Sequence, residues 1–214
     1  MDYLVTFFHS QFFVKLPFPK CDFSDQTVIV TGGNTGLGLE AARHIARLGA
    51  SKIILACRTI SKGEKAAADI TMSEHLTNEC VEVWQLDLTD YASVKAFVKR
   101  VDSLDRLDAF IQNAGILTTK YQVAEGEKST MTVNVTSPVL LGLSVLPKLR
   151  KSAEEYGGRG RLSFVGSDLQ YVAKFKEADT TGSLYDALNN KETADMNDRY
   201  ISQRNCQGTA KTDS

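Results

Sequence analysis

The chain has 214 residues, of which 43% are hydrophobic and 24% charged, values typical of one globular domain with a substantial core. Its formal net charge of −1, with both signs mixed along the chain, gives no electrostatic reason to expect nucleic acid or an anionic membrane as the main partner. The four cysteines lack C-x-x-C spacing and form no cluster with the three histidines. We therefore expect no metal site, reduced thiols, a cytoplasmic location and a small-molecule partner.

Residues 1–20 form an extension that is rich in phenylalanine. Apolar residues such as Phe12 and Phe13 are interrupted by polar ones such as His9 and Lys15, so the segment is too short and broken to predict an integral membrane span or a secretory signal. One interpretation is an extension that packs on the domain. The other is weak attachment to a membrane surface through its aromatic side chains.

From residue 27 onward, short apolar runs alternate with helical patterns. The apolar runs predict five buried strands, at Thr27–Thr31, Lys52–Ala56, Val81–Leu86, Asp108–Gln112 and Arg161–Val165. The intervening segments predict helices at Leu37–Leu48, Lys62–Ile70, Tyr91–Val101 and Lys128–Leu149. This alternation implies right-handed βαβ crossovers, and hence an α/β Rossmann fold with a doubly wound parallel sheet, in one domain over residues 21–201.

Residues 202–214 contain no large apolar side chain. Such a segment buries too little apolar surface to offset its ordering entropy, so we expect a disordered or loosely attached tail.

A glycine-rich turn joins the first strand to the first helix of this pattern. Residues 31–38 read Thr-Gly-Gly-Asn-Thr-Gly-Leu-Gly, and no lysine follows as in a P-loop. Glycine lets the main chain approach an anion, which the first N–H groups of the next helix then face. The alternative is a tight turn without a ligand, but its place in the first βα unit favours a nucleotide.

The end of the second strand bears on which dinucleotide would bind. An NAD site usually has an acidic residue there for the adenosine ribose, whereas this chain reads Ala56-Cys57-Arg58-Thr59. The Arg58 guanidinium is suited to a 2′-phosphate, so the sequence predicts NADP rather than NAD. The alternative is that Arg58 is a solvated surface charge.

With these residues identified, the chain resembles the short-chain dehydrogenase/reductase family, single-domain type. The T-G-x-x-x-G-x-G spacing and Gln112-Asn113-Ala114-Gly115, which departs from N-N-A-G only at Gln112, carry the likeness over about Thr27–Tyr200. Leu-Ala-Cys-Arg is similar to the branch with retinol-dehydrogenase-like and fungal secondary-metabolite reductases. The predicted cofactor contacts are Gly32, Asn34, Thr35, Gly36, Leu37, Gly38, Arg58, Thr59, Asp87, Leu88, Asn113, Ala114 and Gly115.

The resemblance also implies catalytic residues. Asn134 matches the family's structural asparagine, Ser167 its active-site serine and Tyr200 its general acid/base. Hydride would pass between the nicotinamide and a carbonyl or alcohol carbon of a hydrophobic small molecule, while Tyr200 exchanges a proton with the oxygen. Taken singly, each has a plain alternative: a helix-internal amide, a turn serine and a half-buried aromatic.

The chain departs from the family pattern after Tyr200. Arg204 stands where the family has a lysine; it keeps the positive charge, but with a different geometry. The family's last two strands have no counterpart, so we expect a truncated chain with an unpaired sheet edge. Family dimers pack the long helix against the tyrosine helix, which makes a homo-oligomer compatible with the resemblance.

Two functions of different classes follow. The first is an NADP-dependent oxidoreductase acting on a small carbonyl or alcohol. The second is an inactive nucleotide-binding remnant, or a partner that docks on a complete homologue through its sheet edge.

Overall fold

The structure is a computed structural model that describes residues 3–77, 79–118, 120–167 and 179–192. Five parallel strands form its central sheet in the order β3-β2-β1-β4-β7. These strands are β1 (Thr27–Thr31), β2 (Lys52–Cys57), β3 (Val81–Gln85), β4 (Ala109–Gln112) and β7 (Arg161–Phe164). The doubly wound parallel sheet predicted from the sequence is confirmed.

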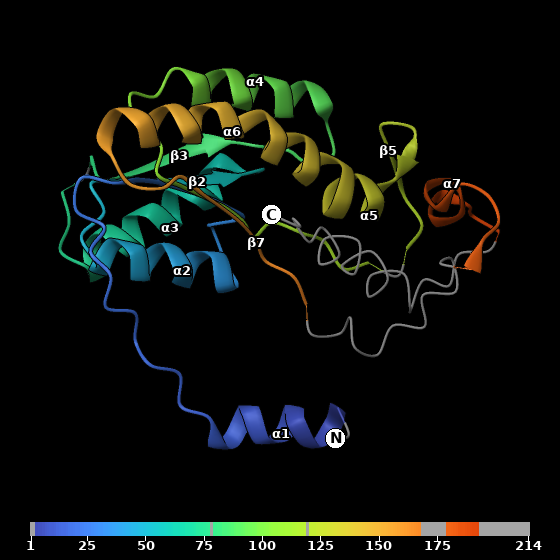
Figure 1. Cartoon of the computed structure of the whole chain (residues 1–214), viewed down its shortest axis with the longest axis horizontal. Coiled ribbons are helices and arrows are strands. Elements are labelled where there is room, and N and C mark those ends of the chain that lie inside the picture. Colours follow the sequence, from blue (N-terminus) through green and yellow to red (C-terminus); the bar gives the residue numbers. More distant parts are fainter. Residues whose placement is uncertain (1–2, 78, 119, 168–178, 193–214) are drawn as a thin grey trace.

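Helices cover both faces of this sheet (Figure 1). They are α2 (Gly36–Arg47) and α3 (Ile60–Ser73) on one face, and α4 (Tyr91–Asp102) and α6 (Ser137–Tyr156) on the other. Val28 and Val30 of β1 belong to the core beneath α2 and α3, whereas Ile29 belongs to the core beneath α4 and α6. Because successive side chains of a strand point to opposite faces, a strand covered on both sides must be apolar throughout, as β1 is.

The strand order reverses its direction at β1, which lies between β2 and β4. In an open parallel sheet, the connections from two such neighbours go to opposite faces and leave a crevice beyond the carboxyl ends of the strands. The glycine turn after β1 and the residues after β4 therefore meet at one edge of the sheet.

The long helix predicted at Lys128–Leu149 is interrupted and extends further. It consists of α5 (Ser129–Met131), a π-helical turn η1 (Thr132–Thr136) and α6, which continues to Tyr156. The Ser137 N–H bonds to the carbonyl of Thr132, five residues back, and Pro138 has no N–H for the regular ladder. By length and composition, the helical stretch Ser129–Tyr156 could span a membrane. However, 61% of its most apolar 18-residue segment is buried inside the protein.

Four elements were not predicted. They are helix α1 (Tyr3–Phe13), the antiparallel pair β5 (Val123–Ala124) and β6 (Glu127–Lys128), and helix α7 (Leu184–Asn189). Helix α1 stands apart from the sheet and its covering helices (Figure 1). The extension instead touches the domain through Phe18, whose ring centroid lies 5.8 Å from that of His44.

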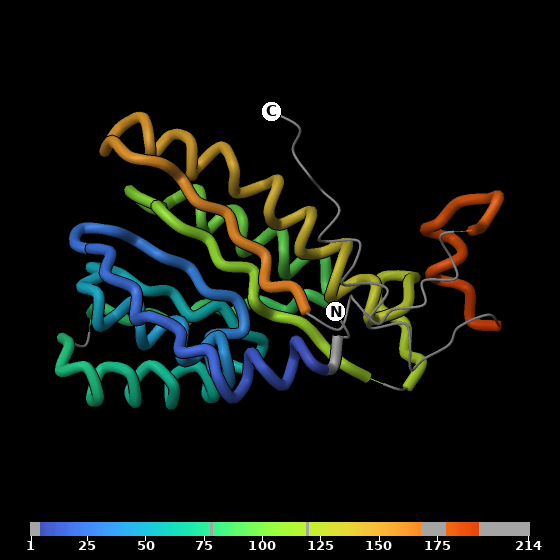
Figure 2. The backbone as a smooth tube through the Cα atoms, turned by 60° about the horizontal axis from the view of Figure 1, so that its bottom comes forward, coloured from blue at the N-terminus to red at the C-terminus, as the bar shows by residue number. Residues whose placement is uncertain are grey.

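Strand β7 lies at the edge of the sheet next to α6 (Figure 2). It pairs with β4 on one side, and no other strand among the described residues pairs with it. The Phe164 side chain in β7 is 39% exposed, and Leu143 on α6 is 63% exposed. The expected tail at residues 202–214 lies outside the described residues.

Candidate functional site

The turn after β1 leaves the amino end of α2 open. Gly32 and Gly36 have φ angles of +66° and +56°, a backbone conformation that residues with side chains rarely adopt. An added Cβ at Gly36 would meet no atom within 4 Å. Thr35, the N-cap of α2, makes no side-chain capping hydrogen bond. The first N–H groups of α2, at the positive end of the helix dipole, can therefore face a phosphate.

Two further glycines allow the turn to pack closely. An added Cβ at Gly33 would lie 2.9 Å from Leu55 Cδ2. One at Gly38 would collide with Asn113 Nδ2 and with the carbonyl oxygen of Gly32. These glycines let α2 pack closely against the ends of β2 and β4, as expected of the glycines in a nucleotide-binding turn.

Thr31 and Asn113 join the turn to the end of β4. The Thr31 hydroxyl oxygen accepts hydrogen bonds from the backbone N–H of Asn113 at 3.0 Å and of Ala114 at 2.9 Å. The Asn113 side-chain amide donates to the Thr31 carbonyl at 3.0 Å. Thr31 is fully buried, so these bonds are shielded from water and fix the separation of the two loops.

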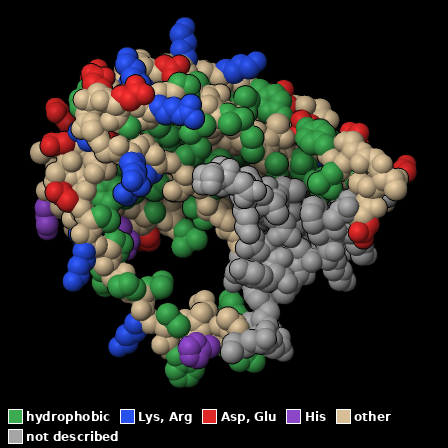
Figure 3. All heavy atoms as spheres, viewed as in Figure 1, with side chains coloured by type: hydrophobic (Ala, Val, Ile, Leu, Met, Phe, Trp, Pro, Cys, Tyr) green, Lys and Arg blue, Asp and Glu red, His purple; other side chains and the backbone are tan. Residues whose placement is uncertain are grey.

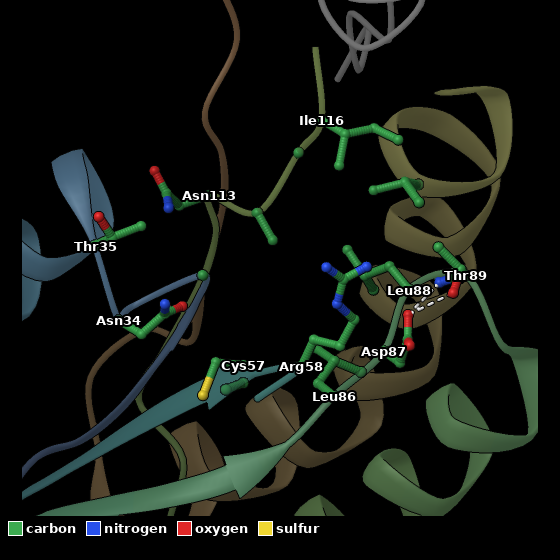
Figure 4. Close-up of a pocket in the computed structure, with 15 residues that line it drawn as sticks. Asn34, Thr35, Cys57, Arg58, Leu86, Asp87, Leu88, Thr89, Asn113 and Ile116 are labelled. Atoms are coloured by element: carbon green, nitrogen blue, oxygen red, sulfur yellow. Dashed lines mark hydrogen bonds between the residues drawn. The ribbon is translucent and has the colours of Figure 1, made fainter. Parts of the chain in front are cut away.

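The ends of β2 and β3 supply the charged groups of the site. Arg58 reaches from the end of β2 into the cleft, toward the side where Asp87, Leu88 and Thr89 lie (Figure 4). The Asp87 carboxylate accepts hydrogen bonds from the Thr89 N–H at 2.9 Å and the Thr89 hydroxyl at 2.6 Å. Burial raises the pKa of the neighbouring Cys57 thiol, so it stays protonated at neutral pH.

Together these loops enclose a cleft of about 280 Å³. Nine of the predicted cofactor residues line it: Gly32, Asn34, Thr35, Arg58, Asp87, Leu88, Asn113, Ala114 and Gly115. Gly36, Leu37, Gly38 and Thr59 were also predicted but are not among the lining residues. The first three form the first turn of α2, and Thr59 occupies the N-cap position of α3 without a side-chain capping hydrogen bond.

Six lining residues were missed by the sequence: Ala56, Cys57, Leu86, Thr89, Ile116 and Val133. Most are apolar or lie at the end of a strand. The only sequence feature that could have identified them is their position near a predicted cofactor contact. The cleft combines an open helix terminus, a guanidinium and a carboxylate with apolar walls, which suits the phosphate, sugar and base of a nucleotide.

Asn134 lies in the π-helical turn and is fully buried. Its side-chain oxygen accepts from the Ile116 N–H at 2.9 Å, and its side-chain amide donates to the Ile116 carbonyl at 2.9 Å. The side chain therefore acts as a clamp on the segment that follows Gly115. Nearby, the Ser137 hydroxyl donates to the Leu88 carbonyl at 2.7 Å, which ties the start of α6 to the loop after β3.

The remaining predicted catalytic residues are described only in part. Ser167 follows β7 at the carboxyl edge of the sheet and is partly buried. Tyr200 and Arg204 lie outside the described residues. Among the residues that the structure describes, no group of three or more His, Cys, Asp or Glu side chains is arranged to hold a metal ion.

Residues 26–176 match the family model of the short chain dehydrogenases. This range contains the glycine turn, Arg58, Asp87, Asn134 and Ser167. The chain belongs to the short-chain dehydrogenase family.

Relatives of this short-chain dehydrogenase cover most of the chain. It is 41% identical over 191 residues to the short chain dehydrogenase/reductase dmxR8 of Cryptosporiopsis sp. and 43% identical over 201 residues to the short chain dehydrogenase atnD of Emericella nidulans. The matches cover 88% and 93% of this chain but 59% and 63% of those relatives, so the chain spans about three fifths of their length.

A solved structure supports the same fold. The short-chain dehydrogenase from Sphingobium yanoikuyae in complex with NADPH matches with a TM-score of 0.59 and 27% sequence identity. The match covers 77% of this chain and 60% of that one.

Proposed function

We propose that this short-chain dehydrogenase binds NADP(H) and transfers hydride to or from a carbonyl or alcohol carbon of a small hydrophobic molecule, within secondary metabolism. The observation that carries the cofactor preference is Arg58. Its side chain stands in the cleft at the end of β2, where an NAD site would have an acidic residue. A guanidinium there would attract the 2′-phosphate that distinguishes NADP from NAD. The NADPH-bound relative from Sphingobium yanoikuyae supports this preference.

The residues of the cleft divide the task of holding the dinucleotide. The open amino end of α2 would bind the diphosphate, Asp87 and Leu88 the adenine, and Arg58 the 2′-phosphate. Bound NADPH supplies the hydride. Asn113, held by Thr31, would keep the loop after β4 in place beneath the ligand.

The reaction itself would use residues beyond the cleft. The Ser167 hydroxyl would donate a hydrogen bond to the substrate oxygen, and Tyr200 would exchange a proton with that oxygen. Arg204 would favour the tyrosinate through its positive charge. Asn134 would act without touching the substrate, because its hydrogen bonds to Ile116 hold the segment that follows Gly115.

A pair of cofactor titrations tests the preference. Wild type should bind NADPH at least about tenfold more tightly than NADH, because a charge-assisted arginine–phosphate contact contributes roughly 1.5–3 kcal/mol. Arg58→Asp should reverse the order, whereas Arg159→Asp, at an exposed residue outside the cleft, should leave it unchanged. Tighter binding of NADH by wild type would contradict the assignment.

NADPH oxidation with a panel of hydrophobic carbonyl compounds tests the reaction. We expect turnover that Tyr200→Phe abolishes while NADPH affinity is retained. Tight NADPH binding without turnover of any carbonyl or alcohol would show that the cofactor site is correct and the proposed reaction is not.

A further inference from the structure

The amino-terminal helix α1 exposes an unusual number of large apolar side chains. Phe8 is 55% exposed, Phe12 74% and Phe13 77%, and Leu16 and Phe18 in the segment that follows are 85% and 74% exposed. Hydrophobic side chains gather along this helix in Figure 3. A contiguous apolar surface of this kind on a water-soluble domain usually marks a binding surface.

Three of the apolar side chains form one ridge along α1. Val5, Phe8 and Phe12 recur at helical spacing, and the Phe8 and Phe12 rings stack with centroids 6.3 Å apart. The spacing places the polar residues Thr6 and Ser10 on the opposite face. Val5, Phe8 and Phe12 therefore form an aromatic ridge on α1, and the helix is apolar beyond it, since Phe7 and Phe13 lie outside this ridge.

The charged residues nearest the carboxyl end of this ridge are lysines, with Asp2 and Asp22 at the borders of the segment. Residues 3–21 contain no Asp or Glu, whereas Lys15 and Lys20 follow the helix. Aromatic side chains next to lysines favour the boundary between lipid headgroups and acyl chains, because the rings enter the apolar layer and the ammonium groups stay among anionic headgroups.

The position of α1 leaves the aromatic ridge accessible to a flat surface. The helix stands apart from the sheet layers, and an extended segment with Pro17 and Pro19 joins it to the domain (Figure 1). A second copy of the chain fits less well. A helix of 11 residues is only about 16 Å long, too short for two copies to bury the roughly 1,200 Å² that a stable interface requires.

We propose that α1 and the segment to Lys20 form a peripheral membrane-binding element, in which the aromatic ridge enters one leaflet of an anionic bilayer and Lys15 and Lys20 contact its headgroups. A single short helix gives reversible attachment, not a span. This inference does not depend on the cofactor or the reaction. It would place the domain at a surface where hydrophobic small molecules concentrate.

Co-sedimentation of the whole chain with lipid vesicles tests the proposal. The protein should bind vesicles of mixed phosphatidylcholine and phosphatidylserine. Phe8→Ser/Phe12→Ser should lower the partition coefficient at least about tenfold, since each buried phenylalanine contributes on that scale. The matched control is Met72→Ser/Leu143→Ser, which removes two side chains that are 72% and 63% exposed on α3 and α6, and it should bind like wild type.

Charge variants test the role of the lysines. Lys15→Glu/Lys20→Glu should weaken binding to phosphatidylserine vesicles by roughly tenfold or more at low salt, and salt should weaken wild-type binding in the same way. Urea unfolding and NADPH affinity should be unchanged in both double variants, because the substituted side chains lie outside the sheet layers.

Three outcomes would overturn the proposal. One is failure of wild type to sediment with anionic vesicles. Another is equal sedimentation of Phe8→Ser/Phe12→Ser and its control. The third is a dimer, measured by light scattering, that Phe8→Ser/Phe12→Ser dissociates while vesicles bind no wild-type protein, which would assign the ridge to a second copy.

Discussion

The hydroxyl oxygen of Thr31, at the end of β1, accepts the backbone N–H of Asn113, at the end of β4, at a distance of 3.0 Å. Asn113 returns a hydrogen bond through its side-chain amide to the Thr31 carbonyl. This reciprocal pair joins two loops that are 82 residues apart in the sequence. It sets the width of the crevice at the point where the strand order reverses.

Replacing Thr31 with valine should destabilise the protein by about 2 kcal/mol. Valine keeps the shape but leaves the Ala114 N–H without the Thr31 hydroxyl in a shielded position, and it leaves the Asn113 N–H with only the Ile111 carbonyl, at 3.1 Å. Chemical unfolding in urea measures the loss, and NADPH affinity should fall with it. Thr31→Ser keeps the hydroxyl and should lose about 1 kcal/mol or less, the contribution of one methyl group; equal losses in the two variants would contradict the role of the hydrogen bonds.

Gly38→Ala should disturb both stability and nucleotide binding. The new Cβ would collide with Asn113 Nδ2 and the Gly32 carbonyl, so the turn must shift, at a cost of about 2 kcal/mol. Calorimetric NADPH titration and urea unfolding report the two effects. Gly166→Ala is the matched control, since an added Cβ there meets no atom within 4 Å, and it should change stability by about 0.5 kcal/mol or less.

Asn134→Asp should make stability depend on pH. At neutral pH a carboxylate oxygen would replace the amide that donates to the Ile116 carbonyl, and the loss should be about 3 kcal/mol. Burial would raise the pKa of this new carboxyl in the folded state. The protonated carboxyl can donate to the Ile116 carbonyl. The stabilisation from this bond is therefore fully present below the ordinary aspartate pKa of about 3.9, and it is lost as pH rises through the raised pKa of the folded state.

Urea unfolding across the acid range measures this dependence. Asn134→Leu removes both hydrogen bonds without adding a titrating group, so its loss of stability should not change with pH relative to wild type. Parallel pH profiles for the Asp and Leu variants would contradict the clamp described for Asn134.

Tyr91 should titrate well above the ordinary tyrosine value of about 10. Burial and then the Glu127 carboxylate, which accepts the phenol at 3.2 Å, raise the pKa of Tyr91 to about 12. Because the pKa is raised in the folded state, the associated stability is complete below the ordinary tyrosine value of about 10 and is lost as pH rises toward 12.

Ultraviolet titration of phenolate formation, with Tyr91→Phe to assign the signal, measures this value. Glu127→Gln should lower it by removing the neighbouring negative charge. Glu125→Gln is the control, because Glu125 accepts the backbone N–H of Tyr91 rather than its phenol, and that variant should leave the phenol pKa unchanged. An equal effect of the two substitutions would contradict the assignment to Glu127.

The sequence predicted the sheet well and the long helix less well. Val28, Ile29 and Val30 are apolar in succession, which only a strand buried on both faces requires, and the structure buries all three fully. The helix beginning near Lys128 differs because periodicity does not reveal a π turn. The π turn is defined by the hydrogen bond from Ser137 to Thr132, next to Pro138, in the stretch where Asn134 bonds to Ile116.

The sequence by itself determined the family, the alternating order of strands and helices, and nine of the fifteen residues that line the cleft, because these depend on residue type and spacing along the chain. Tertiary structure alone decided that Thr31 holds Asn113, that Thr59 stands at the N-cap position of α3 outside the cleft, and that Val133 lines the cleft. It also decided that α1 stands away from the sheet (Figure 1). Such relationships join residues far apart in the chain, and no local pattern encodes the distance between them.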